Sequence, residues 1–342
     1  MPLKRHSVKK GSGFIYVLLA VTLFALVLLS ICWGRFHISM SEFLTWIHSL
    51  SAGTENDTIT HVMLGIRIPR IFAAVLVGMA LSSAGSSYQG VFRNPMVSPD
   101  ILGASAGAGF GASLAIIYGL PTYMIQIISF AFGLIAVLAS CLLSWLSSSR
   151  GSKTLVMILS GMVVSALFNA FISIIKYTAD PYSQLPEITF WLMGGLSDVT
   201  AQGLIATIVP FSAGLLVLML IRWRINVLSL GEEDAMALGI NPGLVRGIVV
   251  CCATLLTSLA ISICGQIGWV GLVVPHMARM LTGPNYRRLL PATALLGGIF
   301  LLAVDNISRN LAVIEIPLGI LTAVTGAPIF VFLLLRGKRG WL

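Results

Sequence analysis

The chain has 342 residues, of which 57% are hydrophobic and only 10% are charged, and its formal net charge is +9. Apolar runs of membrane-spanning length recur along the whole sequence, and no stretch between them is long enough to build a core of its own. This composition excludes a separate soluble domain and argues against nucleic-acid binding. It predicts an all-α, polytopic membrane protein with a single transmembrane domain over residues 1–342.

Ten apolar runs are candidate transmembrane helices. The first resembles a signal sequence in its charged start, but it is too long and lacks a small-residue cleavage site, so we predict a retained helix. The eighth is shorter than the ~20 residues that a bilayer requires. The ten predicted spans are 14–33, 71–90, 101–119, 121–146, 154–175, 204–221, 247–264, 269–281, 289–307 and 316–335.

The distribution of lysine and arginine decides between nine and ten spans. With ten spans, 16 of the 21 basic residues lie on the cytoplasmic side, whereas with nine spans the division is 11 against 10. The positive-inside rule therefore favours ten spans, with both termini in the cytoplasm.

The loop at about 223–245 contains a short acidic helix. We expect Ser229 to cap this helix, with Glu232 three residues later completing a capping box. Gly239 is suited to the left-handed residue that ends a helix, and Asn241 and Pro242 are suited to the cap and first turn of the next helix. A water-exposed helix between two membrane spans predicts a surface for another protein.

Small residues are dense at 82–87 and 103–112. In lipid, such residues let helices approach closely, and this explanation is more common than the lining of a channel. The five cysteines have no zinc or redox spacing and are interpreted as small apolar residues.

No nucleotide-binding motif, catalytic triad or metal-ligand spacing is present, and His276 stands alone beside a proline. Proton-driven carriers usually keep ionisable groups near the middle of their spans. Here only Asp305 is embedded, and it has a possible partner in Arg309 one turn later. We therefore expect the energy source to lie outside this chain.

Arg67, Arg70 and Arg309 fall on the outer side in this topology, against the positive-inside rule. They have two interpretations of equal weight. They are helix-end residues that pair with lipid phosphates or with Glu315, or they form a basic rim that receives an acidic partner.

Several ordered blocks resemble the FecCD or BtuC-like family, the permease subunits of bacterial ATP-binding-cassette (ABC) importers for iron-siderophores, haem and cobalamin. The resemblance extends from residue 66 to residue 335, and the ordered set is far more specific than any single block. The blocks are 67–70 (Arg-Ile-Pro-Arg), 76–81, Gln89, 93–96 (Arg-Asn-Pro-Met), 102–107, 190–195, 231–239, 265–276, 315–319 and 326–329.

The resemblance implies a type II importer permease in the bacterial inner membrane that forms a homodimer. Its partners would be two ATPase subunits, which bind ATP and Mg and carry out hydrolysis, and a periplasmic or lipoprotein binding protein. This chain would then be a non-catalytic transport subunit without a cofactor or metal of its own, embedded in lipid.

The resemblance also assigns residues, position by position. The loop helix would couple to the ATPase through Leu230, Gly231, Glu232, Glu233, Asp234, Ala235, Ala237, Leu238 and Gly239. Docking of the binding protein would involve Arg67, Arg70 and Arg309. The translocation pathway would be lined by Gln89, Asn94, Pro95, Ser160, Gly161, Val164, Ser165 and Phe168, together with span ten.

The cargo stays open at this stage. Residues 96–99 (Met-Val-Ser-Pro) differ from the family's usual leucine and acidic or alanine-rich continuation, so the sequence does not select a substrate. Iron-siderophore comes first as the commonest cargo, with haem, cobalamin and molybdate as alternatives. A secondary carrier for an anionic metabolite, and more distantly a channel or structural membrane protein, are the alternatives from other classes.

Overall fold

A computed structural model describes residues 12–34, 36, 38–52, 57–147 and 153–336. This part of the chain is helical and contains no strand, which confirms the predicted fold class. Each of the ten predicted spans coincides with a helix. These helices are α1 (Ser12–Cys32), α4 (Ile68–Val91), α5 (Ala104–Ile117), α6 (Thr122–Ser147), α7 (Lys153–Thr178), α9 (Ala201–Leu228), α11 (Pro242–Cys264), α12 (Val270–Thr282), α13 (Tyr286–Asn310) and α14 (Leu318–Arg336).

Seven of these helices are long and apolar enough to cross a membrane, so the count of ten is approximate. The helix α5 has 14 residues and extends about 21 Å at 1.5 Å per residue, which is less than the ~30 Å of a hydrocarbon core. The predicted span 101–119 breaks at Gly103, whose φ of 86° ends a short 3₁₀ helix, Pro99–Leu102, before α5 begins. The predicted short eighth span is α12, with 13 residues.

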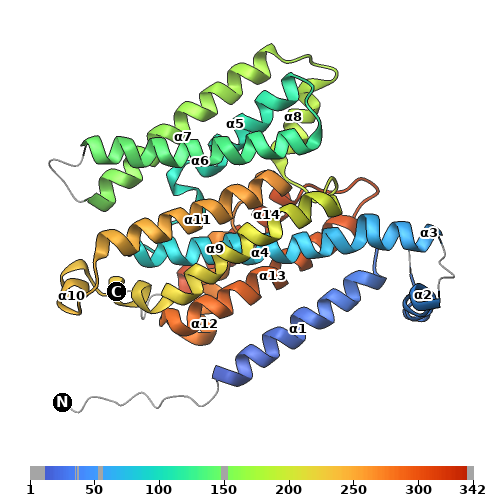
Figure 1. The fold of residues 1–342 in the computed structure, drawn as a ribbon, viewed down its shortest axis with the longest axis horizontal. Helices are drawn as coiled ribbons and strands as arrows, with labels where there is room; N and C mark the ends of the chain where they lie inside the picture. Colours follow the sequence, from blue (N-terminus) through green and yellow to red (C-terminus); the bar gives the residue numbers. More distant parts are fainter. Residues whose placement is uncertain (1–11, 35, 37, 53–56, 148–152, 337–342) are drawn as a thin grey trace.

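The remaining elements lie at the two ends of the bundle, as Figure 1 shows. The predicted loop helix is α10 (Glu232–Ala237), at the end where α1 begins, and we call this the inner end. At the opposite, outer end lie elements that we did not predict. They are α2 (Met40–Ala52), α3 (Asp57–Thr60), a π-helix (His61–Arg67) and α8 (Gln184–Met193).

Close backbone contacts hold the centre of the bundle together, where α4 packs against α11, α12 and α13. A Cβ atom added to Gly85 would lie 1.9 Å from the carbonyl oxygen of Gly271 in α12, and one added to Gly78 would lie 2.1 Å from that of Gly297 in α13. The same is true of α5 and α6, since a Cβ atom on Gly107 would lie 2.4 Å from the Phe132 carbonyl oxygen. Small residues therefore let these helices touch through their backbones, as predicted.

Candidate functional site

The first candidate surface is α10 at the inner end, and its predicted N-terminal cap was wrong. Helix α9 continues to Leu228, so Ser229 becomes its last cap and donates its hydroxyl hydrogen bond to the Asn226 carbonyl oxygen at 2.7 Å. Gly231 precedes α10, whose first turn receives no side-chain cap. The Glu232 carboxylate forms an ion pair with Arg246 of α11 instead, because a guanidinium is a stronger partner than a backbone amide.

The C-terminal end of α10 agrees with the prediction. Gly239 has a φ of 74°, and its amide donates to the Met236 carbonyl oxygen at 2.9 Å. The amide of Ile240 donates to the carbonyl oxygen of Ala235, also at 2.9 Å. These bonds close the helix in the manner of a left-handed glycine cap.

The next helix, α11, starts three residues after Gly239. The Asn241 side chain accepts a hydrogen bond from the Leu244 amide at 3.1 Å, and Pro242 occupies the first turn of α11. Both features were predicted, and together they hold α10 at a fixed position beside the start of α11.

The surface of α10 mixes apolar side chains with carboxylates. Ala235 is fully buried, and it fixes the face that packs against the bundle. Leu230, Met236 and Leu238 have 58–64% of their area exposed, while Glu233 and Asp234 also face outward. Exposed apolar side chains beside charges are typical of a protein-binding surface.

The second candidate surface is formed by the three outer arginines, and the structure places all of them inside the protein. Each is 5–6% exposed. The Arg67 guanidinium donates to the carbonyl oxygens of Ile31 and Phe36 at 2.5 and 2.6 Å, and so ties the end of the π-helix to the end of α1 and the segment after it. Of the contacts named in the first interpretation, the structure shows the one with Glu315, and Arg70 makes it.

Asp305 of α13 lies between the other two arginines and is fully buried. Its carboxylate is 2.9 Å from Arg70 of α4 and 3.1 Å from Arg309 one turn later, so the predicted pairing with Arg309 is confirmed. Arg70 also contacts Glu315 at 2.9 Å, and Glu315 accepts a hydrogen bond from Ser197 at 2.9 Å. We call Arg70, Asp305, Arg309 and Glu315 the outer charge cluster.

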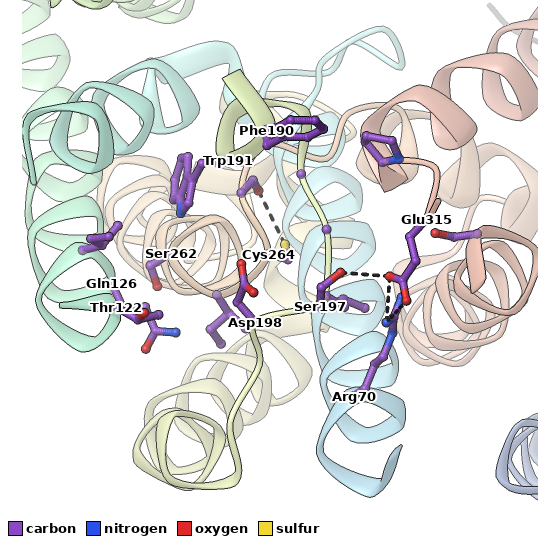
Figure 2. A pocket seen from close by; sticks show the side chains of 18 of the residues that line it. Arg70, Thr122, Gln126, Phe190, Trp191, Ser197, Asp198, Ser262, Cys264 and Glu315 are labelled. Carbon is purple, nitrogen blue, oxygen red and sulfur yellow. Dashed lines mark hydrogen bonds and ion pairs between the residues drawn. The ribbon is translucent and has the colours of Figure 1, made fainter. Parts of the chain in front are cut away.

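The outer charge cluster borders a cavity of about 370 Å³, which Figure 2 shows with Arg70 and Glu315 at one side. Aromatic and polar side chains line the rest of it, among them Trp191, Gln126 and Asp198. These residues come from α8, the start of α6 and the segment after α8. Among the described residues, no group of three or more His, Cys, Asp and Glu side chains has the arrangement of a metal site.

We missed the cavity residues Glu187, Trp191 and Asp198 in the sequence. A signal was present, because residues 190–195 form one of the blocks that carry the family resemblance. Gly194 in that block has a φ of 74° and approaches the Gln266 carbonyl oxygen closely, so it turns the chain back toward α11.

The residues predicted to line a pathway on α7 lie on its packed face. Ser160, Gly161, Val164 and Phe168 are buried and Ser165 is half-buried. Gly161 is the reason, because its missing Cβ lets α7 approach the Ile101 carbonyl oxygen of the 3₁₀ helix. The side of α7 that this protomer leaves exposed includes Met162, Val163 and Leu167.

The other predicted pathway residues lie around the turn after α4. Gln89 is buried and bonds Arg279 of α12 at 3.1 Å and the Val97 carbonyl oxygen at 3.4 Å. Asn94 is exposed, and its side chain accepts from the Met96 amide at 2.9 Å, while Pro95 is half-buried beside it. Gln89 thus braces the turn, and of these three predicted residues Asn94 and Pro95 reach its surface.

Comparisons with known proteins give a consistent result. A model of the FecCD transport family matches residues 22–336. The chain is 38% identical to the molybdate import system permease protein of Haemophilus influenzae, over 95% of this chain and 96% of that protein. It is 39% identical to the probable iron chelatin transport system permease protein of Helicobacter pylori, over 83% of this chain and 85% of that protein.

A solved structure has the same fold. It is a metal-chelate type ABC transporter in an inward-facing conformation, and its chain is 36% identical to this one. The TM-score is 0.85, and the match covers 95% of this chain and 99% of the other.

Proposed function

The chain belongs to the FecCD transport family of ABC importer permeases, and from that premise we propose that it carries a metal chelate, with an iron chelate as first candidate. The observation that carries this proposal is a family match over nearly the whole chain, together with likeness to a metal-chelate type transporter. In this proposal the chain forms a homodimer in the inner membrane. It receives cargo from a binding protein at the outer end and contacts two ATPase subunits at the inner end.

The proposed ATPase contact is α10 together with the two residues before it, Leu230 and Gly231, and the two after it, Leu238 and Gly239. Its exposed leucines and methionine supply apolar area, and Glu233 and Asp234 add charge that a basic groove would match. The Glu232–Arg246 ion pair and the Asn241 cap connect α10 rigidly to α11. A push on α10 is therefore passed to the bundle rather than absorbed by a flexible loop.

A transport assay tests this function directly. The chain is reconstituted in sealed liposomes with its ATPase and binding protein, and uptake of a radiolabelled ferric siderophore is measured. We expect uptake that requires ATP and survives collapse of the proton gradient, because Asp305, the carboxylate embedded in α13, is already paired with two arginines. Uptake that follows the proton gradient would favour the secondary carrier.

Molybdate is the second candidate cargo, since the relative named for molybdate import matches 95% of this chain. The same liposomes distinguish the two cargo proposals when they are loaded with ATP and supplied with labelled molybdate and its binding protein. Uptake of molybdate without uptake of any ferric chelate would replace the iron proposal while leaving the importer role intact.

Docking of the binding protein by Arg67, Arg70 and Arg309 stays a proposal. Because all three are buried with internal partners, an acidic partner would have to displace carboxylates of the outer charge cluster or approach over Glu315, whose side chain is 27% exposed. Reversal of Arg67 and Arg70 to glutamate should weaken association and remove its salt dependence. Unchanged affinity at low salt would leave these arginines with a structural role alone.

The proposed pathway runs along the seam between two copies, near α7 and α14. Cysteines placed at Ser160 and Ser165 should react with a thiol reagent from one side only, and the accessible side should change when the ATPases bind nucleotide. Because these serines are packed against the protomer's own helices here, their labelling requires that packing to open. A cysteine at the exposed Val163 is the matched control.

A further inference from the structure

Two helices bring three arginines together beside the start of α1 at the inner end. The last turns of α9 contribute Arg222, and the first turn of α13 contributes Arg287 and Arg288. We call these three residues the inner arginine cluster.

Aromatic and polar contacts fix the arrangement of the cluster. The Arg287 guanidinium carbon lies 4.3 Å from the centre of the Trp223 ring, which joins α13 to α9. The Tyr16 hydroxyl of α1 donates to the Arg288 carbonyl oxygen at 3.0 Å, and the charges of Arg288 and Arg222 both act on that hydroxyl. The three helices therefore hold the cluster as a defined site.

No carboxylate of the described residues pairs with this charge. In that part of the chain, none of the three arginines forms an ion pair or a hydrogen bond through its side chain. The described carboxylates at the inner end are those of α10, of which Glu232 is paired with Arg246. The cluster is thus a site for an external anion.

An apolar stripe runs from this cluster toward the outer end. Leu216, Leu220 and Trp223 recur at helical spacing on α9 and are 59%, 73% and 46% exposed. Figure 1 shows α1 at the edge of the bundle beside α13, and its side chains Phe14 and Val17 are 71% and 61% exposed. An anion that binds the cluster and carries an apolar chain would pack that chain against this stripe.

We propose that the inner arginine cluster binds an anionic phospholipid. The phosphate would sit among the guanidinium groups, its glycerol region against Trp223 and Tyr16, and one acyl chain along Leu220 and Leu216. Amphipathic aromatic rings are favoured at headgroup level, and basic pockets between membrane helices bind anionic headgroups. The lipid would fasten α1 to α9 and α13, which suits a helix that otherwise contacts mainly α13.

The test is native mass spectrometry of the full-length chain in detergent, titrated with phosphatidylglycerol or with phosphatidylcholine. The cluster variant is Arg222→Gln combined with Arg288→Gln. Because each basic residue near an anionic lipid surface contributes about 1 kcal/mol, loss of two should weaken phosphatidylglycerol binding roughly 30-fold. The matched control is Arg93→Gln, an exposed arginine at the same end outside the cluster, which should stay within about twofold of the wild type.

A second variant keeps the test valid if the first fails to fold. Arg222→Lys with Arg288→Lys retains the charge but loses the planar donors, so an intermediate loss of affinity is expected. Equal binding of phosphatidylcholine, or an equal loss in Arg93→Gln, would overturn the proposal. It would also be overturned if inorganic phosphate displaced the lipid, which indicates a free-anion site. A cluster variant that keeps the lipid but loses the ATPase subunit would assign the surface to that protein.

Discussion

Replacement of Asp305 by asparagine is the sharpest test of the outer charge cluster. The change keeps the size of the side chain and removes the one negative charge that Arg70 and Arg309 share. Asp305 is fully buried, and both arginine side chains are 7% exposed. After the change, Arg70 keeps Glu315, but Arg309 keeps only its hydrogen bonds to Ser30 and Asn306.

The expected loss of stability follows from the burial of the ion pairs that Asp305 forms. Removing one partner of a buried ion pair typically costs about 3–5 kcal/mol, because the remaining charge stays out of water. We therefore expect Asp305→Asn to lose about that much free energy of unfolding. The matched control is Glu315→Gln, since Glu315 contacts Arg70 from a position that is 27% exposed. Its loss should be roughly 1 kcal/mol, as water partly replaces the missing contact.

Unfolding of the purified chain in detergent, followed by loss of the monodisperse peak with temperature, measures both variants. A stability of Asp305→Asn within about 1 kcal/mol of the wild type would refute the reasoning, because the two arginines would then not need the charge. The result also bears on docking. If Asp305→Asn unfolds, charge reversals at Arg70 must be checked for folding before their effect on the binding protein is interpreted.

Two further predictions concern other parts of the fold. Gly239→Val should lower transport with normal membrane insertion, because a β-branched residue resists the φ of 74°; import at the normal rate would contradict the coupling role. Gly85→Ala should destabilise the chain in the same unfolding assay, because its Cβ would lie 1.9 Å from the Gly271 carbonyl oxygen, whereas Gly247→Ala, with open space around it, should be neutral or stabilising.

The sequence predicted the helices well where the determinants are local. The left-handed stop at Gly239 and the Asn241-Pro242 start depend on residues within one turn, and both are present. Ser229 failed as a cap because α9 continues about two turns past the end of the predicted span, and hydropathy does not show where a helix ends in water. The helix α8 was missed because its ten residues are too short for a spanning window.

The outer arginines show the limit of the positive-inside rule. Arg70 finds its partners 235 and 245 residues away in the sequence, so their pairing is a property of the fold. For α7 the difficulty is different, because apolar side chains surround the helix and its sequence does not reveal which face packs inward. Gly161 decides the face through a close approach to the 3₁₀ helix, which depends on tertiary packing.

Helix α4 connects the two ends at which partners are proposed to act. Its first turn contains Arg70 of the outer charge cluster. Just beyond its last turn, the Arg93 guanidinium lies beside Gly231 at the start of α10, 3.7 Å from where a Cβ of that glycine would stand. Between these points α4 extends about 36 Å and touches α12 and α13 through glycine backbones. Side chains cannot absorb a displacement at such contacts, so we propose that a push on α10, passed through α11 to α4, moves α4, α12 and α13 together toward the outer charge cluster.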